Sequence, residues 1–234
     1  MGRTVVIMQP TYLPWSGYFD LMDQADVFVL LDTVQFDKRS WQQRNRVKTA
    51  DGELMLTVPV RSKGRFDQRI ADVEIDRDRR FAETHARSVR MAYARAPYAG
   101  ALLGSWEAVL HGGHTRLADL NADLITWLRD ALGLATPIVR SSSLDVSGKR
   151  VGLLVDICRV LGADAYLSPA GSRGYIEDND LFALNGIRLR YQAYDPPRYR
   201  QLHGAFIPSL SVLDLMLNEG PDSLAVIRSG RHGA

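Results

Sequence analysis

Short apolar runs alternate with segments of helical spacing along most of the chain. Residues 3–8 form an apolar run typical of a buried parallel strand, residues 18–24 have helical spacing, and residues 25–32 form a second buried run. Strand, helix and strand in this order predict a βαβ unit. The loop between the first strand and the helix is then expected at the carboxyl edge of the sheet, where open α/β folds bind ligands.

Later segments extend this alternation and add a hairpin. Residues 53–60 predict a strand entered through a turn at Asp51, and residues 70–75 are its expected partner. Asp76 is the expected N-cap of a helix whose apolar stripe includes His85, and Ser209 is the expected N-cap of a helix near the end of the chain. Further helices are predicted at residues 99–111, 115–132, 149–161 and 212–218, and further strands at residues 137–144, 162–168 and 186–191.

Strands that alternate with helices favour a mostly parallel sheet. We therefore expect the α/β fold class, with a three-layer, mostly parallel sheet, a βαβ start and a small β-hairpin insertion. We expect residues 1–234 to form a single domain, because this length suits one α/β unit with a small insertion.

Composition narrows the function classes. With 234 residues, 46% of them hydrophobic, the chain can bury a sizeable core. One cysteine excludes a disulfide framework and a cysteine-rich zinc site, and no histidine pair has metal-ligand spacing, so we expect neither metal nor cofactor. The amino terminus lacks a signal-peptide pattern, and the apolar runs are shorter than the roughly 20 residues of a membrane span. We expect a cytoplasmic protein without a membrane partner, compatible with an oligomer.

The loop at residues 9–19 combines polar and aromatic side chains that packing alone does not require. Gln9 follows a buried strand, so both atoms of its amide need partners there. Four aromatic residues follow, and they either line the site or close one end of the sheet as core residues: Tyr12, Trp15, Tyr18 and Phe19. The first three are the candidate ligand contacts. We expect this loop to line a binding site.

A second polar segment extends from Asp32 to Lys48. Its residues 38–48 include five basic side chains, which predict a local site for phosphate or carboxylate, although a solvated basic loop has the same composition. Arg44 and Lys48 would share one face of a helix. The candidate ligand contacts in this segment are Gln35, Lys38, Trp41, Arg44, Asn45 and Lys48, with Asp32 as a candidate catalytic residue.

Two later loops carry further candidates. Residues 168–175 follow a predicted parallel strand, so they should return to the same edge of the sheet as the first loop, unless they form an ordinary glycine turn. Residues 196–211 form a long loop, and loops of this length in compact domains are usually functional. The candidates are Ser168, Ser172, Arg173 and Tyr175 in the first loop, and Tyr199, Gln201 and His203 in the second.

Histidine supplies the candidate general bases. His85 lies on the apolar stripe of a predicted helix, so it is either a satisfied core histidine or, if it faces the cleft, the base. His203 is the second candidate. Cys158 lies on an apolar helix face, which favours packing over nucleophilic catalysis.

Motifs throughout the chain carry a family resemblance. They are Gln-Pro-Thr-Tyr-Leu-Pro-Trp-Ser-Gly-Tyr at residues 9–18, Ala-Asp-Val-Phe-Val at 25–29, Asp-Thr-Val-Gln-Phe at 32–36, Arg44-Asn45, Ile-Cys-Arg-Val-Leu-Gly-Ala-Asp-Ala-Tyr-Leu-Ser at 157–168, and Tyr-Arg-Gln at 199–201. With these motifs the chain resembles the WbqC-like family. Members are found with bacterial O-antigen and related sugar-modification pathways, and some are described as glycine transferases that attach a glycyl group to an amino sugar.

A more distant resemblance concerns the first βαβ unit. Residues 15–18, Trp-Ser-Gly-Tyr, occupy the place of the His-x-Gly-His signature of nucleotidyltransferases and class I aminoacyl-tRNA synthetases. Both histidines are replaced by aromatic residues, and a tryptophan ring cannot hold the negative charge that develops in phosphate chemistry. The framework is thus expected to be shared without the adenylating chemistry.

Together these features lead us to expect a transferase. Its substrate would be a phosphate-bearing small molecule such as a nucleotide-linked amino sugar, and its acyl donor could be held on a carrier protein or a tRNA. In this interpretation the basic segment and Arg173 bind phosphate, Gln9, Asp32 and Gln201 orient the reacting groups, and His85 or His203 accepts a proton. Two alternatives stay open, namely nucleotidyl transfer or adenylate formation, and a non-catalytic ligand-binding protein.

Overall fold

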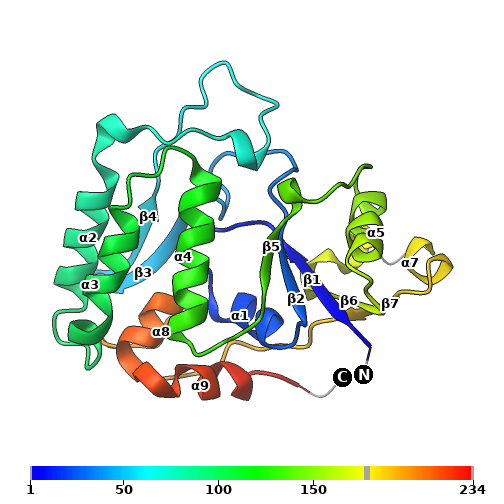
Figure 1. Ribbon diagram of the computed structural model, residues 1–234. Coiled ribbons are helices and arrows are strands. Elements are labelled where there is room, and N and C mark those ends of the chain that lie inside the picture. The colour runs from blue at the N-terminus through cyan, green and yellow to red at the C-terminus, as the bar shows by residue number, and fades with distance from the viewer. Residues whose placement is uncertain (1, 177–179, 233–234) are drawn as a thin grey trace.

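A five-stranded parallel sheet forms the centre of the molecule (Figure 1). The computed structural model describes residues 2–176 and 180–232, except for the side chain of Tyr175. Its strand order is β5-β2-β1-β6-β7, and every neighbouring pair is parallel. The strands are β1 (Thr4–Met8), β2 (Val27–Leu30), β5 (Ile138–Arg140), β6 (Ala165–Ser168) and β7 (Arg188–Tyr191).

Helices cover both faces of this sheet. Alternate residues of each central strand point to opposite faces, so Val6 and Phe28 belong to one core cluster, and Val5 and Val29 belong to the other. On the first face lie α1 (Ser16–Asp23), α4 (Leu117–Ala131) and α8 (Val212–Glu219), and on the second lie α5 (Val151–Val160) and α7 (Leu181–Leu184) (Figure 1). The expected three-layer α/β class is therefore confirmed.

The remaining helices are α2 (Phe81–Ala92), α3 (Ala99–Leu110), α6 (Arg173–Ile176) and α9 (Ser223–Ser229). The structure corrects both expected N-caps. A 3-10 turn and Arg80, which has a φ of +43°, separate Asp76 from α2, so Asp76 does not cap it. Ser211, rather than Ser209, caps α8, because its Oγ accepts a hydrogen bond of 3.2 Å from the backbone N–H of Leu213. Within the described residues no helix has the length and apolar character that crossing a membrane requires.

The hairpin has a different partner from the one expected. Strand β4 (Gly52–Thr57) pairs in antiparallel register with β3 (Arg44–Thr49). Residues 70–75 instead contain a 3-10 turn and two isolated bridges, between Val60 and Ile75 and between Glu74 and Arg116. The tight turn at residues 50–51 brings β3 beside β4 at once, so this local pairing forms in place of the longer loop. The basic segment that could have been helical is thus a strand from Arg44 onward.

The strand order creates a topological switch point. From β1 the chain moves to β2 and β5 on one side, and it then crosses to β6 and β7 on the other side. The loops after β1 and β6 therefore diverge from neighbouring strands at the carboxyl edge of the sheet. In open α/β sheets this divergence leaves the crevice in which ligands bind.

Candidate functional site

A cavity of about 540 Å³ lies at this switch point. We call it the switch-point crevice, and its polar lining includes Gln9 and Thr11 after β1, Gln35 after β2, Arg150 before α5, and Ser172 after β6. Apolar side chains, among them Leu31 and Tyr166, form the rest of the wall. The expectation that the 9–19 and 168–175 loops share one edge of the sheet is confirmed.

Gln9 is held in one orientation at the rim of this crevice. The Nε2 of Gln42 donates a hydrogen bond of 2.8 Å to Gln9 Oε1, and the hydroxyl of Tyr18 donates one of 3.3 Å to the Gln9 backbone carbonyl. Because its side-chain oxygen is engaged from within the protein, the N–H groups of the Gln9 amide are the part that remains available to a ligand. This arrangement suits the stabilisation of a developing negative charge.

A second, aromatic cavity of about 280 Å³ lies on the other side of the same loop. Trp15, Tyr18 and Trp41 contribute to its wall, and the Arg46 guanidinium lies 5.5 Å from the centroid of the Trp41 ring. A Cβ on Gly17 would lie 2.3 Å from the Trp15 ring, so only glycine lets this ring pack against α1.

The two cavities share wall residues. Met8 and Thr11 line both the switch-point crevice and the aromatic cavity. The backbone between the cavities is fixed by Asn45, whose Nδ2 donates to the carbonyls of Tyr12 at 3.2 Å and Leu13 at 2.7 Å. The 9–19 loop is therefore a partition between two adjoining cavities.

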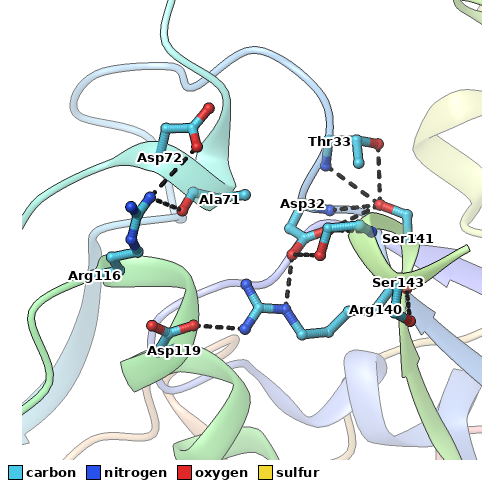
Figure 2. A network of polar contacts seen from close by, with 10 residues as sticks. Asp32, Thr33, Ala71, Asp72, Arg116, Asp119, Arg140, Ser141 and Ser143 are labelled. Atoms are coloured by element: carbon cyan, nitrogen blue, oxygen red, sulfur yellow. Dashed lines mark hydrogen bonds and ion pairs between the residues drawn. The ribbon is translucent and has the colours of Figure 1, made fainter.

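Asp32 lies behind the crevice in a saturated polar network (Figure 2). Its Oδ1 accepts hydrogen bonds of 2.9 Å from the Ser141 hydroxyl and the Ser142 backbone N–H, and its Oδ2 accepts bonds of 2.8 Å from Arg140 Nε and the Ser142 hydroxyl. Burial on its own would raise the pKa of Asp32, but the hydrogen bonds from Ser142, Arg140 and Ser141 bring it below its ordinary value. The Arg140 guanidinium also pairs with Asp119 of α4.

The structure places His85 away from the crevice. It is buried on α2, where its Nδ1 lies 2.8 Å from the Tyr12 hydroxyl, and it forms part of the floor of a third cavity of about 980 Å³. Burial lowers the pKa of His85 to about 4, so the ring is neutral near pH 7. Its contact with the 9–19 loop is through Tyr12, which is itself fully buried.

Lys48 joins the hairpin to the long loop. Its Nζ donates to Gln201 Oε1 at 3.2 Å, to the Gly204 carbonyl at 3.3 Å and to the Ala205 carbonyl at 2.6 Å, and the side chain is 1% exposed. Nearby, the Tyr199 hydroxyl donates to Asp214 at 2.7 Å. These candidates take part in internal hydrogen bonds that fix the 196–211 loop.

The other candidates lie in several places. Arg44 opens β3, and its Nε is buried without a hydrogen-bond partner among the described residues. The Arg173 guanidinium lies 4.4 Å from the centroid of the Tyr191 ring, whereas Lys48 is bonded to Gln201. Arg44, Lys48 and Arg173 therefore have separate neighbours. His203 pairs with the Ala92 carbonyl at 2.6 Å. The remaining candidates are Ser168, which is buried and bonded to Ser172, Lys38, which lines the third cavity, and Tyr175, whose side chain lies outside the described residues.

Sequence reasoning missed three residues of the site. Thr11 lies inside the loop that the sequence singled out, and Gln42 belongs to an amide pair in the basic segment, so both had a signal. Arg150 had none, because only the fold brings the start of α5 to the crevice. Among the residues described, no group of three or more His, Cys, Asp or Glu side chains could hold a metal ion.

The sheet order and the adjoining cavities define an α/β protein with a candidate ligand site at its switch point. The sequence profile of the WbqC-like protein family matches residues 9–226, and the chain belongs to this family. It is 36% identical over 232 residues to "Uncharacterized protein Rv1507c" of Mycobacterium tuberculosis (strain ATCC 25618 / H37Rv), an alignment that covers 97% of this chain and 99% of that protein. No solved structure matches the chain.

Proposed function

We propose that the protein is a transferase that moves a glycyl or other (amino)acyl group onto the amine of a nucleotide-activated amino sugar or a similar small acceptor. The observation that carries the proposal is the pair of adjoining cavities that share Met8 and Thr11. Transfer between two substrates requires them to be held next to each other, and such positioning contributes about 7–11 kcal/mol to catalysis. Cytoplasmic polysaccharide or natural-product biosynthesis would provide this acceptor.

The acceptor's phosphates fit the switch-point crevice in this proposal. Arg150 lines it at the start of α5, where the backbone N–H groups of a helix favour anions, and Ser172 lines the same crevice. The aromatic cavity suits the flat or apolar part of a substrate, because Trp15 and Trp41 offer ring faces. Gln35 is a proposed substrate contact in the switch-point crevice, and Asn45 is one in the aromatic cavity.

The chemistry is a direct transfer. The amine nitrogen attacks the acyl carbon of an ester or thioester, the C–N bond forms, the C–O or C–S bond breaks, and the amine proton leaves with the alkoxide or thiolate. An amine whose pKa is about 8, like that of an α-amino group, is partly neutral near pH 7. The attacking amine therefore needs no strong base. The N–H groups of Gln9 would stabilise the oxyanion of the tetrahedral intermediate.

Adenylate formation is the less favoured alternative. The positions of the two signature histidines hold Trp15, which packs over Gly17, and Tyr18, which donates its hydroxyl proton to a backbone carbonyl. Neither side chain carries the positive charge of a protonated histidine, and the Tyr18 hydroxyl is already bonded to the Gln9 carbonyl, so neither takes over the role of a signature histidine. A magnesium-dependent release of pyrophosphate would favour this alternative over acyl transfer.

The proposed transfer is tested directly by measuring the mass of the product. Purified protein is incubated with a nucleotide-linked amino sugar and each activated glycyl donor in turn, and mass spectrometry detects an acceptor that gains one glycyl unit. Binding of the acceptor without any product from ester, thioester or aminoacyl-RNA donors would instead indicate a ligand-binding protein.

We predict that Gln9→Ala lowers kcat by about 10²–10³-fold, the usual effect of removing one oxyanion donor. Acceptor binding, measured by calorimetry, should change little, because the amide acts on the intermediate. Gln24→Ala is the matched control, since Gln24 bonds to Asp20 at the far end of α1. A Gln9→Ala enzyme with full kcat would exclude this role.

A further inference from the structure

A large basic hollow lies beside the crevice. This is the cavity of about 980 Å³ whose floor includes His85, and we call it the basic hollow. Its lining includes six basic side chains and one acidic side chain, Asp76. The basic residues come from three separate segments and are Lys38, Arg39, Arg61, Lys63, Arg65 and Arg79.

The positive charge of this hollow is open to ligands. Arg39 and Lys63 are exposed and form no ion pair within the described part of the chain. Three other basic side chains of the hollow form ion pairs at the protein surface. They are Arg61 with Asp78 at 3.7 Å, Arg65 with Glu74 at 3.1 Å and Arg79 with Asp76 at 3.3 Å. Exposed ion pairs are weak, so these arginines can exchange a carboxylate for a phosphate.

An exposed aromatic side chain follows a lining residue of the basic hollow in the chain. Phe66 is 82% exposed, the highest value among the large apolar side chains of the described residues, and it directly follows Arg65. An isolated exposed phenylalanine has no packing role. Beside a row of cations, it matches the combination that binds single-stranded nucleic acid, in which cations follow the phosphates and an aromatic ring stacks on a base.

Gln35 links the crevice to the loop that contributes Arg61, Lys63 and Arg65 to the basic hollow. This side chain lines the switch-point crevice, and its Nε2 donates a hydrogen bond of 3.2 Å to the carbonyl of Phe66. The loop at residues 61–67 lies at the carboxyl edge of the sheet (Figure 1). On the other side, Arg39 lies in the same loop as Gln42, which orients Gln9. A single-stranded nucleic acid bound in the basic hollow would therefore have one end directed toward the switch-point crevice.

We infer that the basic hollow binds the single-stranded end of an RNA, which delivers its acyl group to the switch-point crevice. This inference rests on the proposed function, since it names the class of acyl donor. The phosphodiester backbone contacts Arg39, Lys63 and their neighbours, and a base stacks on Phe66. The same cations would attract an acidic carrier protein, but a carrier protein offers no base to stack on Phe66, so the combination of cations and an exposed ring favours RNA.

Fluorescence anisotropy tests the inference without any catalytic step. The probe is a labelled 12-nucleotide single-stranded RNA, titrated with wild-type protein at several salt concentrations. Phe66→Ala should weaken binding by about tenfold. The double variant Arg39→Ala/Lys63→Ala should weaken it further and lower the slope of log K against log salt by about 1.4, which is about 0.7 for each lost phosphate contact.

Matched variants separate a site from general charge attraction. Arg188→Ala/Arg200→Ala removes the same charge from exposed positions outside the basic hollow, and Met91→Ala removes an apolar side chain that is 74% exposed. Both controls should bind RNA like wild type. Equal losses in test and control variants, or binding of an acidic acyl carrier protein with no binding of RNA, would overturn the inference. Nucleotide-sugar binding by calorimetry, measured in parallel, tests the crevice independently, so failure of the RNA site would leave the proposed function standing.

Discussion

At the scale of single residues, the polar candidates have two kinds of environment. Gln9, Gln35 and Ser172 line the switch-point crevice, although each also forms a hydrogen bond within the protein. Asp32, Lys48 and Gln201 do not line the crevice and are engaged in internal hydrogen bonds. The sequence distinguishes these groups poorly, because a polar residue near a strand end looks the same whether its partner is a ligand or a distant loop. Only the tertiary contacts separate them.

The buried His85 should make stability depend on pH. Its pKa is lowered from 6.5 to about 4 in the folded protein, so its stabilising contribution is full above pH 6.5 and is lost as the pH falls toward 4. By linkage the loss amounts to about 3 kcal/mol of the free energy of unfolding. We expect urea denaturation to show this fall in wild type and a smaller one in His85→Gln, where the side chain does not titrate.

The comparison of these two proteins isolates His85 from the other histidines, which are the same in both. If the free energy of unfolding falls equally in wild type and in His85→Gln between pH 6.5 and 4, then His85 is accessible to protons in the folded state. That result would restore it as a candidate base facing solvent.

At the scale of elements, apolar periodicity located the sheet strands well. Buried parallel strands are continuous apolar runs, so β1 and β2 were visible in the sequence with small errors at their ends. Strand β3 was not, because its residues Arg44–Thr49 are mostly polar and only Val47 is an apolar buried side chain. The strand is defined by pairing with β4 and by buried polar contacts, and a hydrophobic pattern contains neither.

Removing the Lys48 ammonium should loosen the long loop. Lys48→Met keeps most of the side-chain volume but leaves the carbonyls of Gly204 and Ala205 and the amide of Gln201 without their shared donor. Hydrogen bonds to a charged group contribute about 1.5–3 kcal/mol, so local opening should become about 10–100-fold more frequent. Hydrogen exchange should detect this at Ile207, whose N–H donates to Gln201 Oε1.

The exposed Lys149 provides the control, since Lys149→Met changes the charge equally without touching this loop. Exchange in residues 199–207 that stays at the wild-type rate in Lys48→Met would show that the other hydrogen bonds of the loop, such as those of Tyr199 with Asp214 and of His203 with the Ala92 carbonyl, fix it without Lys48.

At the scale of the whole molecule, the parallel sheet and its ligand-binding edge could be predicted, but the basic hollow could not. Alternating strands and helices lead to a parallel sheet, and strand direction then brings the 9–19 and 168–175 loops together. The hollow instead combines Lys38, Arg61 and Arg79 from segments that share no sheet and no repeating pattern. Their convergence depends on how β4 and α2 pack, which no local sequence signal contains.

The Asp32 network should connect the sheet to the helical layer energetically. It joins the ends of β2 and β5 through Ser141 and Arg140, and Arg140 continues to Asp119 on α4 (Figure 2). Asp32→Asn removes the charge from a fully buried position, so we expect the free energy of unfolding to fall by about 1.5–3 kcal/mol at pH 7.

Asp119→Asn is the matched control, because it changes the second partner of the same Arg140 at a position whose side chain is 41% exposed. It should lower the free energy of unfolding by less than about 1 kcal/mol.

The pH dependence of stability gives a second test of the Asp32 network. The pKa of Asp32 is lowered from 3.8 in the folded state, so its contribution is present above pH 3.8 and disappears as the pH falls below that value. The stability difference between wild type and Asp32→Asn should therefore shrink below about pH 4 in chemical denaturation. Equal losses in the two variants, or a difference that persists unchanged at pH 3, would mean that the Asp32 carboxylate does not hold the sheet edge against α4.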